Sequence, residues 1–256
     1  MKYKDGSTLT DDEVVGLLIA LLFAGQHTSS ITSTWTLMFL LHNPECMEKV
    51  MGEQNSIMGG KSQNGSIDFD AVGEMEYLQN CVKESLRLHP PLIMLMRMAM
   101  KDIATKLDGK EYVPASASVS ASLSVSTSLP HTLTPSLTSA PFTRRYVIPK
   151  GDIVITSPAV ASRMESVFAR ADAFEPERFG PERNEQKTPF AYLGFGGGLH
   201  QCMGQQFGLL QVKTIMSVLL RNYRFEKTTT AFPEPDYTAM VVGPKNHCKV
   251  KYTKIN

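Results

Sequence analysis

The chain has 256 residues, of which 42% are hydrophobic and 20% are charged, and its formal net charge is +1. This composition is that of a soluble globular protein, and so small a charge gives no electrostatic case for binding nucleic acid or an anionic membrane. The four cysteines, at positions 46, 81, 202 and 248, form no Cys-x-x-Cys pair. Their scatter argues against a structural zinc site and a secreted disulfide framework, and it favours a reducing compartment.

The first residues predict no membrane anchor. Residues 1–6 contain neither an apolar signal core nor an anchor. The most apolar run, Val14 to Gly25, is too short to span a bilayer. We therefore expect a chain that is soluble or only peripherally attached to a membrane.

A long helix is predicted from Thr10 to about His42. Thr10-Asp11-Asp12-Glu13 has the form of a capping box, with acidic residues at the positive end of the helix. The residues that follow are apolar on nearly all sides, which predicts a buried helix.

A small and polar cluster, Ala24-Gly25-Gln26-His27-Thr28, interrupts this helix. Ala24 and Gly25 share a face with Thr28, so this face has room for a ligand. The Thr28 hydroxyl can bond the Ala24 carbonyl and locally open the helix. Taken alone, a self-satisfied buried threonine and a structural His27 are the simpler interpretations.

Two further helical stretches follow, Pro44 to about Met58 and Phe69 to Leu88. The second contains Glu84 and Arg87, which are three residues apart and can pair on one face. By itself such a pair is common and contributes little on a surface. A Phe-Glu-Pro-Glu-Arg-Phe segment ending at Phe179 lies further along the chain.

The segment from Leu92 to Met100 is apolar and rich in methionine, with Arg97 in its middle. Methionines form an adaptable wall that suits a bulky apolar ligand. A buried strand with gap-filling methionines is the alternative. An arginine in such surroundings needs an anionic partner.

Residues 115–143 contain no Asp, Glu, Lys or Arg and consist mostly of Ser, Thr, Ala, Leu, Val and Pro. This low complexity gives no basis for a packed fold. Short strands are expected after it, over residues 152–158, 223–225 and 248–252.

The stretch from Phe195 to Gly204, Phe-Gly-Gly-Gly-Leu-His-Gln-Cys-Met-Gly, places Cys202 between a glycine-rich turn and a helix from about Met203 to Asn222. Free N–H groups at a helix start favour thiolate over thiol, and a thiolate is a soft metal ligand. For a lone cysteine the alternative is a buried structural residue beside a turn.

The pattern Phe-x-x-Gly-x-x-x-Cys-x-Gly resembles the haem-binding loop of the cytochromes P450. The other motifs occur in that family's order, and the resemblance implies a mainly α fold with small β-sheets (α+β). Cys202 would be the axial ligand of haem b, and its thiolate would favour O–O cleavage. Arg97 and His200 would contact the propionates. The remaining cofactor-binding positions would be Phe195, Gly198, Gly204, Ala24 and Gly25.

The resemblance also implies roles for residues outside the loop. Thr28 and His27 would be catalytic, delivering protons to dioxygen, a role that suits imidazole near neutral pH. Glu84, Arg87 and Arg178 would form a structural triad behind the haem. The substrate pocket would be lined by Leu92, Ile93, Met94, Leu95, Met96 and Met240. The family usually has Pro-Phe where this chain has Gly194-Phe195.

The string Ala-Gly-Gln-His-Thr-Ser-Ser resembles the sterol 14α-demethylases in particular. The implied reaction is oxidative removal of a sterol 14α-methyl group, with electrons from NADPH through a reductase partner. The family is associated with the endoplasmic reticulum membrane. A non-catalytic fragment or incomplete gene model, and a monooxygenase acting on another lipid, are the alternative interpretations.

The resemblance covers residues 1–256 as the C-terminal part of one P450 domain. Residues 113–145 would be an insertion, possibly translated intron sequence, because the family has only a short strand pair there and Tyr-Val occurs on both flanks. Without the rest of the domain, the long helix and the methionine-rich segment would expose apolar surface.

Overall fold

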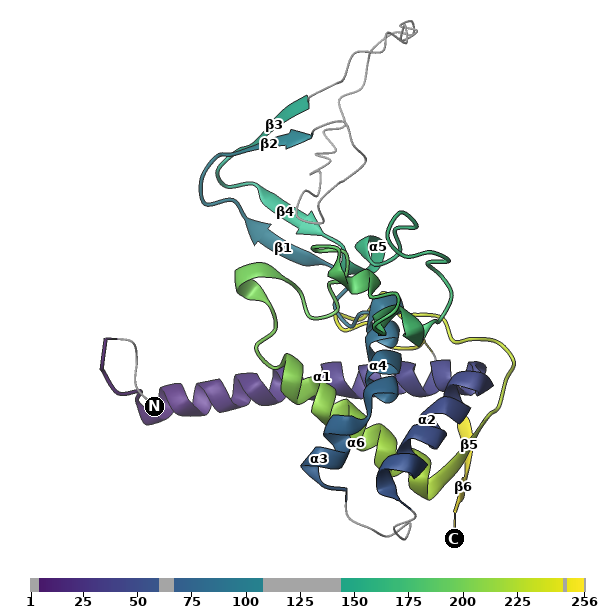
Figure 1. The fold of residues 1–256 in the computed structure, drawn as a ribbon. Coiled ribbons are helices and arrows are strands. Elements are labelled where there is room, and N and C mark those ends of the chain that lie inside the picture. Colours follow the sequence, from purple (N-terminus) through teal and green to yellow (C-terminus); the bar gives the residue numbers. More distant parts are fainter. Residues whose placement is uncertain (1–4, 60–66, 108–143, 246–247, 256) are drawn as a thin grey trace, which may run out of the picture.

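The structure, a computed structural model, describes residues 5–59, 67–107, 144–245 and 248–255 (Figure 1). Its α-helices are α1 (Asp11–His42), α2 (Pro44–Met58), α3 (Phe69–Glu74), α4 (Glu76–Leu88), α5 (Pro158–Ala161) and α6 (Gln205–Asn222). Its strands are β1 (Leu95–Met98), β2 (Ile103–Leu107), β3 (Arg144–Ile148), β4 (Ile153–Thr156), β5 (Tyr223–Lys227) and β6 (Val250–Lys254). Short 3₁₀ turns cover Pro176–Phe179, Glu185–Lys187 and Gly198–His200. The expectation of a mainly helical chain with small sheets is confirmed.

Helix α1 begins where the sequence predicts. The Thr10 side chain accepts from the Glu13 N–H, and the Glu13 carboxylate accepts from the Thr10 N–H, which completes the capping box. The helix then continues without a break to His42. The hydroxyl–carbonyl bond expected at Thr28 thus does not interrupt the helix.

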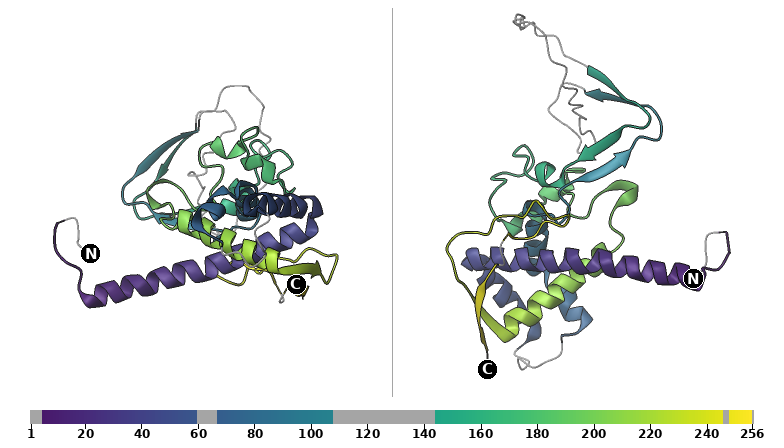
Figure 2. Two further views of the ribbon diagram at one scale, coloured as in Figure 1. Left: turned by 60° about the horizontal axis from the view of Figure 1, so that its bottom comes forward. Right: turned by 180° about the vertical axis from the view of Figure 1, so that it is seen from behind.

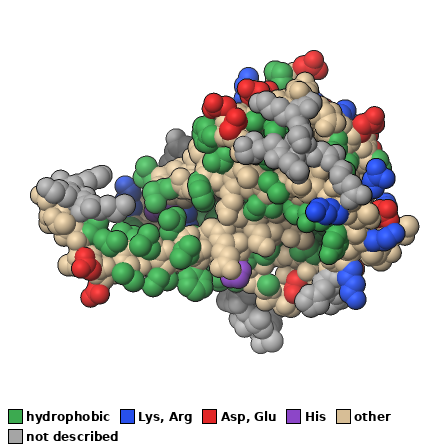
Figure 3. Space-filling view, turned by 90° about the horizontal axis from the view of Figure 1, so that it is seen from below, with side chains coloured by type: hydrophobic (Ala, Val, Ile, Leu, Met, Phe, Trp, Pro, Cys, Tyr) green, Lys and Arg blue, Asp and Glu red, His purple; other side chains and the backbone are tan. Residues whose placement is uncertain are grey.

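The two halves of α1 differ in burial. The second half packs in the helical body, and Trp35 and Leu40 are completely buried. The first half projects away from that body, and its apolar side chains between Leu17 and Phe23 are exposed (Figures 1 and 3). The prediction of a helix buried along its length is wrong for this half, whereas the predicted exposed apolar surface is confirmed.

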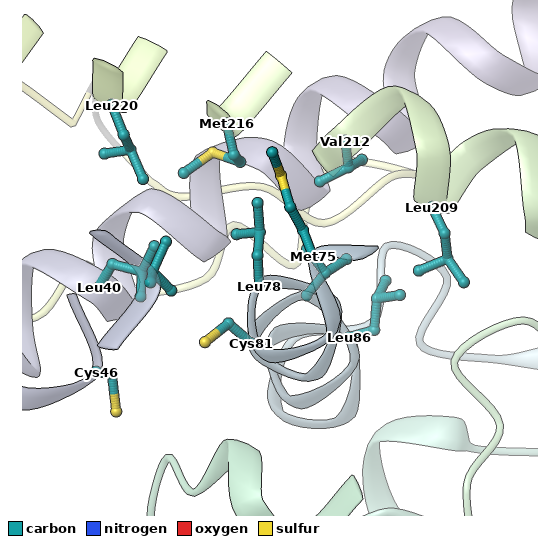
Figure 4. Packing of buried hydrophobic residues seen from close by; sticks show 12 residues of the cluster. Leu40, Cys46, Met75, Leu78, Cys81, Leu86, Leu209, Val212, Met216 and Leu220 are labelled. Carbon is teal, nitrogen blue, oxygen red and sulfur yellow. The ribbon is translucent and has the colours of Figure 1, made fainter. Parts of the chain in front are cut away.

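The main core lies where α4 and α6 pack against α2 and the second half of α1. Figure 4 shows Leu78 and Leu86 of α4 pointing toward Leu209, Val212 and Met216 of α6. The predicted helix over residues 69–88 is divided into α3 and α4 at Met75, whose ψ of 76° is not helical. The Glu53 carboxylate of α2 accepts from the first N–H groups of α4, at Tyr77 and Leu78, which favours the start of a new helix there.

The strands form three antiparallel pairs, and β1–β4 and β2–β3 extend as an arm from the helical body (Figures 1 and 2). In the first pair Leu95 lies opposite Thr156 and Met98 opposite Ile153. In the second, Ile103 lies opposite Ile148 and Leu107 opposite Arg144. The predicted insertion, residues 113–145, lies outside the described residues except at its end. The chain enters and leaves that region through two paired strands.

An aromatic cluster joins the end of α4 to α1. The His89 ring stacks on Trp35 with 4.0 Å between ring centroids and is also close to Phe39 and Phe232. Burial in this cluster, together with the positive charge of Arg163, lowers the pKa of His89 to about 4. The folded protein thus favours the neutral ring.

We expect His89 to make stability depend on pH in a defined window. Its folded-state pKa is depressed, so its contribution is present above the unfolded value of about 6.5 and is lost as pH falls toward 4, with an upper bound of about 3 kcal/mol. His89→Phe keeps the stacking and should make the free energy of unfolding change less with pH between pH 6.5 and 5. Urea unfolding at several pH values measures this, and equal pH slopes in both proteins would contradict it.

Candidate active site

The Cys202 loop folds back on itself through backbone hydrogen bonds. The Cys202 N–H donates to the Phe195 carbonyl oxygen at 2.9 Å, and the Gly196 N–H donates to that of Leu193 at 3.0 Å. Gly196 and Gly198 have φ values of +73° and +67°, which other residues rarely adopt. Helix α6 begins at Gln205, two residues later than predicted. The turn therefore presents Cys202 immediately before a helix N-terminus.

Cys202 is exposed, so the alternative of a buried structural cysteine is wrong. Leu199 and Met203, on either side of it, are fully exposed apolar residues. Behind them the loop is anchored: Phe195 packs against the main core, and a Cβ on Gly197 would lie 3.2 Å from Leu193 and Phe190. The loop therefore has a packed side and a free side, and the thiol is not covered.

The structure gives a reason for glycine at position 194. A Cβ there would lie 2.5 Å from the Tyr192 hydroxyl oxygen and 2.7 Å from Cζ. That hydroxyl is buried and has no hydrogen-bond partner in the described part of the chain. The Tyr192 ring packs edge-on against Phe179 with centroids 5.1 Å apart. Tyr192 thus occupies the space that any side chain at Gly194 would need.

Gly194→Ala should destabilise the chain by about 1–3 kcal/mol, because a packed ring must move. Adding Tyr192→Phe should recover part of this loss, since it removes the nearest atom and an unsatisfied hydroxyl. Gly52→Ala in α2 is the matched control, because its Cβ would meet nothing within 4 Å, and it should be neutral or stabilise by up to about 1 kcal/mol. Urea unfolding tests all three, and a neutral Gly194→Ala would contradict the steric argument.

The structure brings Glu84, Arg87 and Arg178 together, all with completely buried side chains. Arg87 donates to both Glu84 carboxylate oxygens at 2.7 and 2.9 Å, and Arg178 donates to one of them at 3.1 Å. Arg87 also donates to the backbone carbonyls of Ser162, Ala171 and Ala173.

A second layer of charges surrounds this cluster. Glu175 accepts from Arg178 and Arg183, and Glu185 accepts from the same two arginines. Sequence reasoning missed Glu175, Arg183 and Glu185. The charged residues clustered around Arg178 were the only signal for them. The network joins α4 to the segment that leads into the Cys202 loop.

On α1, the Thr28 hydroxyl donates to the Ala24 carbonyl oxygen at 2.7 Å, as the sequence predicts. Thr28 and Gly25 are half-buried, and a Cβ on Gly25 would meet nothing within 4 Å. Ala24 and His27 are exposed. This stretch of α1 therefore presents small and polar groups with open space around them.

The methionine-rich segment is not a buried strand, so that alternative is wrong. Leu92, Met94 and Met96 are exposed, whereas Ile93 and Leu95 are half-buried. Arg97 is exposed and donates to the Met96 carbonyl oxygen at 2.7 Å. It has no carboxylate partner among the residues that the structure describes.

The C-terminal turn is held between α1 and the start of the methionine-rich segment. The Val242 N–H donates to the Pro91 carbonyl oxygen at 2.9 Å, and Trp35 Nε1 donates to the Val242 carbonyl oxygen at 3.2 Å. Met240, on this turn, is exposed. Sequence reasoning missed Trp35 and Val242, although Trp35 is the chain's only tryptophan. These two bonds tie the turn that carries Met240 to α1 and to the start of the methionine-rich segment.

The residues present fit a flat, metal-containing group better than a metal ion bound by protein alone. In the described ranges no group of three or more His, Cys, Asp or Glu residues could hold a metal ion. Cys202 instead offers one uncovered thiol beside exposed apolar side chains. Arg97 and His200 are exposed, and no described carboxylate pairs with Arg97. A single soft ligand with apolar surroundings suits iron held in a macrocycle.

Comparison with known families identifies the class of protein. The family model of cytochrome P450 matches residues 1–126 and 124–252. The chain belongs to the cytochrome P450 family.

The chain is similar to curated sterol demethylases along nearly its whole length. It is 44% identical to the sterol 14-demethylase of Arabidopsis thaliana over 99% of this chain and 45% of that protein. It is 43% identical to the obtusifoliol 14-alpha demethylase of Sorghum bicolor, over 99% of this chain and 44% of that protein. Against the human lanosterol 14-alpha demethylase, identity is 35% over 95% of this chain and 40% of that protein. The chain spans less than half the length of these relatives.

The expectation of a chain without an anchor is not supported. Helix α1 is long and apolar enough, by length and composition, to cross a membrane, and only 6% of its most apolar window is buried. The whole of α1 is long enough to span a bilayer, whereas the apolar run from Val14 to Gly25 alone is too short.

Proposed function

We propose that the chain is the C-terminal part of a haem-thiolate monooxygenase of the sterol 14α-demethylase type, with Cys202 as the axial ligand of haem b. The observation that carries this proposal is the uncovered Cys202 thiol on a glycine turn whose far side is packed against the core. The 44% identity to a sterol 14-demethylase supports the subfamily.

Each loop residue has a proposed part in holding the cofactor. The φ values of Gly196 and Gly198 let the backbone turn close to a flat ligand, and Gly204 leaves the approach to the thiol free. Arg97 and His200 bind the propionates. When bound, haem supplies reductive activation of dioxygen with electrons from NADPH through a reductase partner.

The polar cluster of α1 handles protons. Thr28 holds its hydroxyl proton toward the Ala24 carbonyl, and its oxygen remains free to accept a hydrogen bond from a water or substrate group. His27, one residue earlier, is exposed and passes protons between solvent and Thr28. Ala24 has a small side chain and Gly25 has none, so a small molecule can reach Thr28.

The substrate is a sterol, as it is for relatives whose names specify obtusifoliol and lanosterol. The exposed apolar side chains of residues 92–96, together with Met240, form a soft wall that suits a rigid, bulky lipid. A sterol partitions into membranes, so location at the endoplasmic reticulum membrane fits this substrate.

The exposed apolar surfaces of α1 and the methionine-rich segment are covered by the rest of a P450 domain. The relatives are more than twice as long as the part that this chain matches. Residues 113–145 are an insertion between the paired strands β2 and β3.

The absorption spectrum of the purified, reduced chain under carbon monoxide tests the proposal. A thiolate–haem complex gives a Soret band of its own, distinct from that of haem bound by histidine or free in solution. Absence of this band would reject a functional enzyme and would favour a non-catalytic fragment, the alternative that the short coverage of the relatives supports.

Substrate class and proton delivery have separate tests. Titration with a sterol should change the haem spin state, whereas a response only to fatty acids would favour a monooxygenase of another lipid. His27→Ala should reduce turnover more than haem content. Equal loss of both would contradict a role for His27 in proton delivery.

A further inference from the structure

Six of the hydroxyl groups that follow His27 on α1 make hydrogen bonds of two kinds. Most donate to the carbonyl four residues earlier in the same helix, so they hold nothing outside α1: Thr28, Thr32, Ser33, Thr34 and Thr36. Ser29 differs, because its hydroxyl donates to Gln211 Oε1 of α6 at 2.9 Å. The Ser29 side chain is thus a direct polar connection between these two helices.

This hydrogen bond lies close in the chain to both parts of the proposed site, the polar cluster of α1 and the Cys202 loop. Ser29 is buried and directly follows Thr28. Gln211 is seven residues beyond Gly204, which is about 10 Å or two turns along the helix that begins at the Cys202 loop. One bond therefore joins the helix that carries His27 and Thr28 to the helix that carries the thiol loop.

Helices α1 and α6 also share the main apolar core. Leu40 of α1 and Leu209, Val212, Met216 and Leu220 of α6 belong to the main apolar core. Apolar contacts are not directional, so they tolerate small rotations and shifts of one helix along another. The hydrogen bond between Ser29 and Gln211 has strict requirements of distance and angle.

We propose that Ser29 and Gln211 are positioning residues, whose hydrogen bond fixes the rotation and height of α1 relative to α6 and so sets Thr28 against the Cys202 loop. The effect of this bond on catalysis rests on the proposed function. The bond itself is present in the chain without cofactor. The pair acts through Thr28 and Cys202.

Amide hydrogen exchange on the full haem-free chain tests the contact. Ser29→Ala should speed exchange about fivefold in residues 24–30 of α1 and, across the interface, in residues 205–211 of α6, as loss of one partly buried hydrogen bond predicts. Ser33→Ala is the matched control, because Ser33 is also buried but bonds only to its own helix. It should leave exchange in α6 unchanged.

Gln211 provides a second, independent variant. Gln211→Leu removes the acceptor and should reproduce the effect of Ser29→Ala, and the double variant should add nothing to either. Gln211→Glu keeps an acceptor oxygen and should restore slow exchange. Additive effects, or equal exchange in the Ser29→Ala and Ser33→Ala chains, would overturn the proposal.

Turnover by the haem-loaded chain distinguishes a positioning role of Ser29 from a purely structural one. Ser29→Ala should lower the fraction of NADPH electrons recovered in product about fivefold at unchanged haem content, whereas Ser33→Ala should not. An unchanged fraction would reduce the pair to a structural contact and overturn its positioning role. A chain that takes up no haem would reject the proposed function instead, and the exchange measurements would then decide the proposal alone.

Discussion

Cys202→Ser should abolish the Soret band of the thiolate–haem complex in the reduced, carbon-monoxide-treated protein, with little effect on the free energy of unfolding. The band requires a sulfur ligand, and a serine hydroxyl remains protonated and binds iron weakly. The Cys202 side chain is exposed and belongs to neither apolar cluster, so the fold does not depend on it.

Cys248→Ser is the control for this prediction. Cys248 is also a free cysteine, but it is half-buried, and burial raises the pKa of its thiol. The protonated form is a poor metal ligand, so this variant should keep the band. A band that survives Cys202→Ser, or that disappears with Cys248→Ser, would mean that Cys202 of the glycine loop is not the haem ligand.

Glu84→Gln should destabilise the chain by about 3–5 kcal/mol, which is a large part of the stability of most domains. The substitution keeps the size of the side chain but removes the negative charge between two completely buried guanidinium groups. It also weakens the acceptor for the Glu175 N–H, which donates to Glu84 at 2.9 Å. Two buried positive charges would then lack their central counter-charge.

The matched control is another glutamate in an ion pair, Glu177. Its partner Lys49 lies at 2.6 Å, but the two side chains are 53% and 45% exposed. Glu177→Gln should therefore cost less than about 1 kcal/mol. Urea unfolding of the two variants compares a buried pair with an exposed one directly. Equal losses would mean that the Glu84 cluster does not hold the core together.

The sequence predicted local structure well where local signals are strong. The capping box at Thr10 and Glu13 and the proline at the start of α2 located two helix starts correctly. The back-bond from Thr28 to Ala24 follows from the helix period alone. The spacing of Glu84 and Arg87 placed them on one face, but their burial depends on the distant segment around Arg178.

Features that depend on tertiary structure were not predictable in this way. The apolar pattern of α1 indicated burial along its length, yet what covers a helix is decided by other segments, and the first half is exposed. The division at Met75 needs the Glu53 carboxylate, which comes from a different helix. The hydrogen bond from Ser29 to Gln211 joins residues 182 positions apart, and no local pattern distinguishes Ser29 from its neighbours.

The same holds for Gly194. A departure from the usual proline in the resembled loop has no local explanation. The ring of Tyr192 supplies one, since it fills the space beside the Gly194 α-carbon. Packing of Tyr192 thus leaves no room at this position for a proline ring.

The position of Trp35 gives the protein an internal fluorescent reporter. Its indole is completely buried, stacks on His89 and donates to Val242 of the C-terminal turn. Because the chain has one tryptophan, all indole emission comes from this junction. Release of the C-terminal turn should therefore shift the emission to longer wavelength before the helical core unfolds. A single optical signal can thus follow the assembly of three segments that are far apart in the sequence.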